Sequence, residues 1–145
     1  MLNVECSLRA NAAMFHVHPI DSLELPELAP YRTLRRPREH AAQGIFVAEG
    51  DKVVHRLLES SFEIVSVLLP EKRLAEFENL LQRRPEKNIP VYSVAKKNIL
   101  EALVGFEMFQ GVLAIGKITA RPTLDSVLAS SPRPQLFVAV DGLTS

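Results

Sequence analysis

Four short apolar runs alternate with amphipathic segments between residues 44 and 118, and this alternation constrains the fold more than any other feature. The runs are "GIFVAEG", "EIVSVLLP", "IPVYSV" and "GVLAIGKI", at 44–50, 63–70, 89–94 and 111–118. They are rich in Val, Ile and Leu, which is typical of strands covered on both faces. Because strands that alternate with helices indicate an α/β fold, we expect a three-layer sandwich with helices on both faces of a mostly parallel or mixed sheet.

The segments between the runs carry apolar residues at helical spacing. The stripes expected to face the sheet are Val53, Val54, Leu57 and Leu58 in 51–60, Leu74, Phe77, Leu80 and Leu81 in 71–84, and Ile99, Leu100, Leu103 and Val104 in 94–105. Ser93 is the expected N-cap of the last helix, and Gly105 its stop. A further helix is expected over about 26–34, ended by Pro37. Residues 1–21 lack sustained periodicity and are expected to form a tail or lead-in.

The C-terminal part of the sequence differs from the alternating unit. Prolines 122, 132 and 134 punctuate residues 119–134, which we interpret as a linker between domains. The linker contains one short helix, "TLDSVLA", with Thr123 as its N-cap. Residues 135–141, "QLFVAVD", read as a buried strand followed by a turn signal. Residues 22–118 are therefore expected to form one domain, and residues 135–145 to begin a second domain whose remainder is absent.

Composition excludes several classes of protein. Lys and Arg number 17, as do Asp and Glu, so any nucleic-acid binding must come from a local patch. The single cysteine, Cys6, excludes an internal disulfide and favours a reducing compartment. No apolar run approaches the ~18 residues that suggest a membrane span, and no basic leader precedes an apolar block. We expect a cytoplasmic location and no membrane partner.

One charged patch stands out in "YRTLRRPREH", residues 31–40. Four arginines fall within seven residues, and a histidine adds a fifth possible donor; the candidate RNA contacts are Arg32, Arg35, Arg36, Arg38 and His40. Arginine suits phosphate because its planar guanidinium bonds two oxygens at once. Pro37 is expected to hold the backbone extended, so that its neighbours project from a loop. The alternative is a solvated loop that pairs with Glu39, Glu49 and Asp51.

Other candidate sites are weaker. Glu49 and Asp51 flank Gly50 at a strand-to-helix turn, where capping and the helix dipole explain them better than catalysis does. His16 and His18 lack companion ligands at zinc-finger spacing, His55 is expected to be exposed, and Cys6 has no companion base. Lys96 and Lys97 open a helix against its dipole, which leaves a ligand contact open. Because neither phosphate-loop motif occurs, the residues predict a binding module without an active site.

The order of these pieces resembles the SpoU (TrmH-like) family of RNA ribose 2′-O-methyltransferases, from about Leu28 to Ser145. "RTLRRPREH" followed by "GIFVAEGDKVVHRLLES" looks like the entry to the family's substrate-binding domain. Gln110-Gly111-Val112-Leu113-Ala114 looks like the close of that domain, and "LFVAVDGLTS" like the first half of the first methylase motif. One departure is Phe109, where the family often has a histidine.

The resemblance implies a substrate-binding domain similar to a small ribosomal-protein-like α/β sandwich that binds structured RNA. It also implies a C-terminal knotted α/β domain that binds S-adenosylmethionine, carries the chemistry and forms the dimer. The later motif residues have no counterpart in this sequence, so no catalytic, cofactor or metal residue is assigned. The RNA-binding role is carried over onto Arg32, Arg36 and Arg38, with Glu49 and Gly50 as framework. This chain alone is expected to be monomeric, free of cofactor and inactive.

Three hypotheses for function follow. The chain is the RNA-binding domain of an S-adenosylmethionine-dependent rRNA or tRNA ribose 2′-O-methyltransferase, with no role for DNA. Alternatively, it is a stand-alone, non-catalytic RNA-binding module of ribosomal-protein-like fold. The third hypothesis is a small-molecule-binding or protein-interaction α/β domain, which predicts no RNA affinity.

Overall fold

A computed structural model describes residues 14–95, 111–120, 122–136, 138 and 140–142. Within these ranges the strands form one mixed sheet of five, in the order β1-β4-β3-β5-β2. The strands are β1 Phe15–Ile20, β2 Ile45–Glu49, β3 Ile64–Pro70, β4 Ile89–Val94 and β5 Leu113–Lys117. β1, β4 and β3 run parallel, whereas β5 runs antiparallel to both β3 and β2. The prediction of an α/β fold with a mixed sheet is confirmed.

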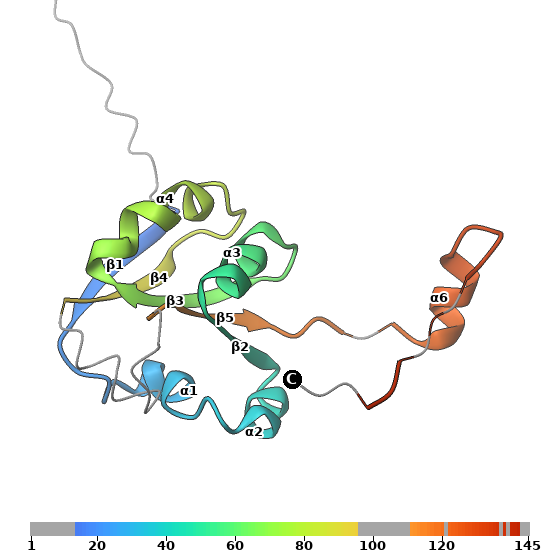
Figure 1. The fold of residues 1–145 in the computed structure, drawn as a ribbon, viewed down its shortest axis with the longest axis horizontal. Helices are drawn as coiled ribbons and strands as arrows, with labels where there is room; N and C mark the ends of the chain where they lie inside the picture. Colours follow the sequence, from blue (N-terminus) through green and yellow to red (C-terminus); the bar gives the residue numbers. More distant parts are fainter. Residues whose placement is uncertain (1–13, 96–110, 121, 137, 139, 143–145) are drawn as a thin grey trace, which may run out of the picture.

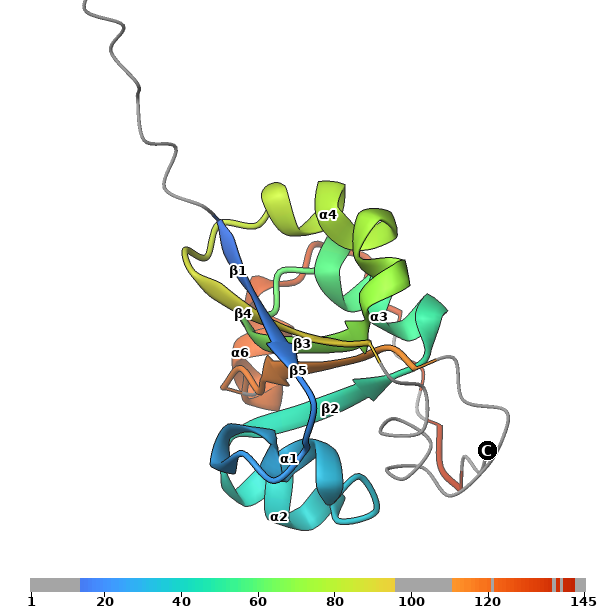
Figure 2. The ribbon, with the colours of Figure 1, turned by 90° about the vertical axis from the view of Figure 1, so that its left-hand side faces the viewer.

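Helices cover both faces of this sheet (Figures 1 and 2). One face carries α3 and α4; the other carries η1, α1 and α2. Their bounds are η1 Pro26–Leu28, α1 Ala29–Arg32, α2 Pro37–Ala42, α3 Asp51–Glu59, η2 Glu71–Arg73 and α4 Leu74–Gln82. The side chains of β3 alternate between two buried clusters: Val67 and Leu69 pack toward α3 and α4, and Leu68 packs toward α1. Burial on both faces explains why the strand sequences lack polar alternation.

The four strands and two of the helices expected from the alternation are present. Leu57, Leu58, Phe77 and Leu81 are buried as predicted. Val53 was expected to face the sheet, but it is 53% exposed, because Val54 at the next position takes the inward direction. The helix expected over 94–105 lies almost entirely outside the described residues.

β1 is the main correction to the predicted architecture, because Phe15–Ile20 was assigned to a tail. The strand pairs in parallel with β4, with Phe15 opposite Ile89 and Ile20 opposite Val94. It lies at the edge of the sheet, and its four central residues are exposed. An edge strand with little burial carries little apolar periodicity, so the sequence pattern missed it. Pro19 is compatible with this position because an edge strand needs only one side of its backbone for pairing.

The C-terminal segment also departs from expectation. Helix α6, Leu124–Ser130, is present, and the Thr123 side chain caps it by accepting a hydrogen bond from the Ser126 N–H at 3.2 Å. The strand expected over 135–141 is absent from the described residues there, and Leu136 is 89% exposed. A buried parallel strand needs a neighbour for its backbone groups, and no described strand pairs with this segment.

A buried arginine joins two connections on the α3–α4 side of the sheet. Arg84 follows α4, and its guanidinium donates to the backbone oxygens of Leu58, Ser60 and Phe62 at 2.9, 2.5 and 2.6 Å. The same guanidinium forms two hydrogen bonds with the Glu86 carboxylate, at 2.6 and 2.9 Å. Arg84 therefore ties the α3–β3 connection to the α4–β4 connection.

Among the described helices, none has the length and hydropathy needed to cross a bilayer.

Candidate nucleic-acid interface

The candidate interface lies where α1 leads into the first turn of α2. We call it the arginine turn and define it by the exposed residues Arg35, Arg36 and Arg38. The sequence suggested that Pro37 holds the backbone extended. In the structure it is instead the first residue of the helix α2. Proline suits this position because its fixed φ matches a helix and the first helical N–H has no partner within the helix. The turn therefore ends in a short helix, with Arg36 immediately before it and Arg38 inside its first turn.

The arginine turn is anchored to the sheet through α1. Tyr31 is fully buried, and its hydroxyl lies 2.7 Å from the Ser66 hydroxyl of β3. Burial raises the pKa of the Tyr31 hydroxyl well above its usual range, although the Ser66 hydrogen bond opposes this, so the pair is neutral. Arg32 adds a second anchor, since its Nη1 donates to the backbone oxygens of Leu23 and Leu25. Arg32 was predicted as an RNA contact, and part of its hydrogen-bonding capacity is engaged within the chain.

His40 is not positioned as an RNA contact, in contrast to the prediction. It is 3% exposed, and its Nε2 lies 2.9 Å from the Thr33 hydroxyl oxygen. The reason is the helix that begins at Pro37, because it turns His40 inward while Arg38 remains outside. Thr33 carried no signal in the sequence, since its role depends on the chain reversal between α1 and α2.

A shallow hollow lies at the arginine turn, lined by Arg35, Arg36, Pro37, Arg38 and Glu39. Its charged lining residues are three arginines and one carboxylate, that of Glu39. The Arg36 and Glu39 side chains pair at 3.4 Å, and both are more than half exposed. An exposed pair of this kind contributes about 0–1 kcal/mol, so an incoming phosphate replaces it at little cost. The hollow has the composition of an anion-binding surface.

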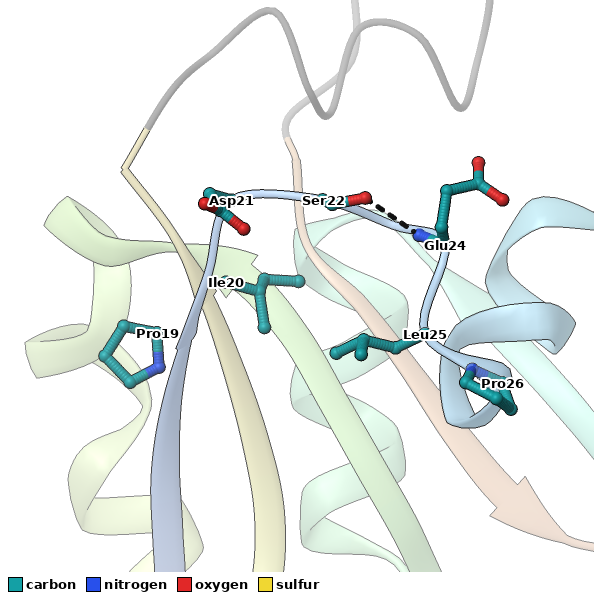
Figure 3. A pocket seen from close by; sticks show the side chains of 7 residues that line it. All are labelled: Pro19, Ile20, Asp21, Ser22, Glu24, Leu25 and Pro26. Carbon is teal, nitrogen blue, oxygen red and sulfur yellow. Dashed lines mark hydrogen bonds between the residues drawn. The ribbon is translucent and has the colours of Figure 1, made fainter.

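A second hollow follows the carboxyl end of β1, lined by Pro19, Ile20, Asp21, Ser22, Glu24, Leu25 and Pro26 (Figure 3). Ile20 and Leu25 point toward one another across it, and the Ser22 hydroxyl accepts a hydrogen bond from the Glu24 N–H at 3.2 Å. Its charged lining residues are acidic, which repels phosphate. Of these two hollows, the arginine turn is the one suited to a nucleic-acid backbone.

The turn at Glu49, Gly50 and Asp51 joins β2 to α3. Gly50 has φ +89° and ψ 156°, a conformation accessible essentially to glycine, and its N–H donates to the Val112 oxygen at 3.0 Å. The Asp51 carboxylate accepts a hydrogen bond from Arg73 at 2.8 Å. Asp51 therefore pairs with Arg73 and not with an arginine of the arginine turn. This argues against Asp51 as a partner in the alternative in which the basic loop pairs with nearby acidic residues. Glu49 is exposed at the end of β2.

The histidines are used in packing and pairing. His16 Nε2 lies 2.9 Å from the Asn88 side-chain oxygen, and the His18 ring packs on Tyr92. His55 is half-buried rather than exposed, since its ring packs against Phe77 with centroids 4.6 Å apart. In the described part of the chain no three His, Cys, Asp or Glu residues gather into a metal site. The remaining candidates, Cys6, Lys96, Lys97 and Phe109, lie outside the described residues.

Comparisons with known proteins agree on one family. Residues 47–120 match the SpoU family described as RNA 2′-O ribose methyltransferase substrate binding. Uncharacterized tRNA/rRNA methyltransferases of Mycobacterium bovis and Mycobacterium tuberculosis are each 30% identical to the chain in an alignment of 110 residues that covers 73% of the chain. The chain spans 37% of the length of these relatives.

Two solved structures share the fold. A crystal structure of an AdoMet-bound rRNA methyltransferase from Sinorhizobium meliloti aligns over 73% of this chain and 38% of its own, with a TM-score of 0.55 and 20% identity. A second structure of an rRNA methyltransferase from the same organism aligns over 73% of this chain and 39% of its own, with a TM-score of 0.54 and 20% identity.

Proposed function

The chain belongs to the SpoU substrate-binding family, and from that premise we propose that it is the RNA-recognising part of an S-adenosylmethionine-dependent ribose 2′-O-methyltransferase acting on rRNA or tRNA. The observation that carries the proposal is the arginine turn, where Arg35, Arg36 and Arg38 surround one open hollow. In this proposal the turn grips the RNA backbone, and a separate methylase domain transfers the methyl group.

The electrostatics of the arginine turn support a phosphate ligand. The chain as a whole has no net charge, so attraction to RNA must be local. Three guanidinium groups within four residues provide it, and Arg36 already pairs with an anionic group, the Glu39 carboxylate, at 3.4 Å. The aromatic neighbour Tyr31 is buried and does not offer a face for base stacking. Contacts of this kind grip a folded RNA without reading its sequence.

We further propose the division of the chain. The RNA-binding domain, expected from the sequence over 22–118, is extended to include β1, so that it begins near Phe15. Residues 119–134 form a linker with α6, and residues 135–145 contribute the first strand of the methylase domain in the longer protein. S-adenosylmethionine and the dimer contact are assigned to that domain, so no step of methyl transfer is assigned to this chain, which we expect to be monomeric and inactive.

The test is the salt dependence of RNA binding by the whole 145-residue chain, measured by fluorescence anisotropy with a labelled RNA hairpin. We expect the variant R35A/R36A/R38A to bind RNA weakly. The magnitude of the slope of log K against log salt should fall by about two to three, since each phosphate contact contributes about 0.7–0.9 to it. The control K52A/R56A/R83A removes the same charge from the α3–α4 face, at exposed positions. It should bind nearly as the wild type does.

The outcomes separate the three hypotheses. Equal losses in both triple variants would reduce the effect to net charge and contradict a specific interface. No affinity of the wild-type chain for the hairpin would favour the small-molecule or protein-interaction hypothesis. RNA binding by the chain without methyl transfer from S-adenosylmethionine is expected from the domain of a methyltransferase. Detection of the native protein at 16.2 kDa in extracts of its source would instead favour the stand-alone RNA-binding module.

A further inference from the structure

We propose that His40 is a positioning residue that sets the geometry of the arginine turn and thereby its grip on RNA phosphates. The inference rests on the proposed function, and it goes beyond it by assigning the arrangement of the turn to one partly buried hydrogen bond. His40 touches no ligand in this proposal. It acts through Arg36 and Arg38, which flank the start of α2.

The direction of the His40 hydrogen bond follows from the other bonds of Thr33. The Thr33 hydroxyl lies 3.1 Å from the Ala29 backbone oxygen and 3.4 Å from that of Pro30, and both can only accept. The single hydroxyl proton of Thr33 is therefore directed at α1. Toward His40 the oxygen must accept, so Nε2 of His40 carries a proton and donates at 2.9 Å. This bond links the end of α1 to the last turn of α2.

The residues enclosed by this bond are those of the arginine turn. Between Thr33 and His40, the Arg36 N–H donates to the Thr33 oxygen at 2.8 Å, and the His40 N–H donates to the Arg36 oxygen at 3.3 Å. The backbone of Arg36 is thus held from both sides. The side chains of Arg35, Arg36 and Arg38 remain exposed, while the backbone beneath them is fixed.

α2 depends on this link because it is short and α1 is firmly placed. A helix of six residues does not persist through its own hydrogen bonds. α1 is held through Tyr31 and Ser66 to β3, and through Arg32 to the segment after β1. His40 is buried, and its contact with Thr33 connects α2 to α1, in addition to the contacts that α2 makes with β2. Loss of its donor therefore frees the arginine turn before it unfolds the sheet.

A mobile arginine turn binds phosphate more weakly, because its backbone and side chains must become ordered when RNA binds. Ordering flexible side chains costs affinity, and a bidentate guanidinium contact requires a fixed approach. We expect His40→Ala to bind the RNA hairpin about three- to tenfold more weakly, with a salt slope lowered by about one phosphate contact. His40→Gln should largely restore both, because its side-chain amide places a donor near the former Nε2.

The experiment measures the salt slope of hairpin binding for wild type, His40→Ala, His40→Gln and Thr33→Val, with native-state hydrogen exchange at the Arg36 amide. Thr33→Val removes the acceptor at similar volume and should match His40→Ala, while the double variant should add little. Leu81→Ala, in the core on the other face, controls for lost stability and should leave the slope unchanged. A wild-type slope and wild-type Arg36 protection in His40→Ala would overturn the inference, whereas a wild type that does not bind RNA would overturn the proposed function instead.

Discussion

Replacing Arg84 with methionine tests how much of the stability rests on one buried guanidinium. Methionine keeps much of the side-chain volume but removes every donor. Three backbone oxygens, those of Leu58, Ser60 and Phe62, then lose a charged donor, and the Glu86 carboxylate loses its charged partner. Arg84 has a side chain that is 5% exposed, so water replaces these bonds only in part.

The magnitude follows from those lost bonds. Each buried group left without a partner costs about 1–3 kcal/mol, and breaking a buried ion pair costs about 3–5 kcal/mol. Because the hydrogen bonds to Ser60 and Phe62 are only partly buried, so that water can replace them in part, the costs do not sum. We expect the free energy of unfolding to fall by about 3–5 kcal/mol, a large share of the ~5–15 kcal/mol of a typical domain.

Urea denaturation followed by circular dichroism measures this difference. The midpoint should fall while the m-value stays constant, since the folded state keeps its buried area. Arg83→Met is the matched control, because the neighbouring arginine is exposed and should change stability by less than about 0.5 kcal/mol. A loss below about 1 kcal/mol for Arg84→Met would refute the reasoning that this guanidinium holds the two connections together.

Three further predictions concern the core and pH. Burial alone would raise the pKa of the Glu86 carboxyl, but hydrogen bonds from Arg84 and the Ile64 N–H outweigh burial and lower that pKa. The ionised Glu86 carboxylate therefore stabilises the folded state fully above about pH 4.3, the ordinary pKa of a glutamate. This stabilisation is lost as the pH falls through the lowered pKa of the folded state. The melting-temperature difference between wild type and Glu86→Gln should therefore shrink on acidification. Gly116→Ala should lower the free energy of unfolding by about 1–3 kcal/mol, because the new Cβ would lie 2.6 Å from the Phe46 ring. Adding Phe46→Leu to the Gly116→Ala variant should recover part of this loss, as measured by urea titration. Tyr31→Phe should cost about 1–2 kcal/mol in the same assay, since it leaves the buried Ser66 hydroxyl unpaired.

Sequence patterns predicted those strands whose residues are uniformly apolar because both faces of the strand are buried. β2, β3, β4 and β5 lie close to the predicted apolar runs because both faces of those strands are covered, which makes their composition distinctive. β1 escaped prediction because it is an edge strand with exposed residues. At 135–141, an apolar run of the same kind has no strand to pair with in the described residues. Composition reports a tendency to be buried, and pairing depends on what lies beside the segment.

The arginine cluster illustrates the same limit for the candidate site. The sequence alone established that four of the eleven arginines of this neutral chain lie at 32–38, and that arginine suits phosphate. Only the tertiary structure decided which side chains face outward. Pro37 begins a helix, and that helix leaves Arg36 and Arg38 exposed while it turns His40 inward onto Thr33. Local composition fixes which chemical groups are present, but their direction depends on contacts between segments distant in the sequence, such as Tyr31 on Ser66, which no local pattern encodes.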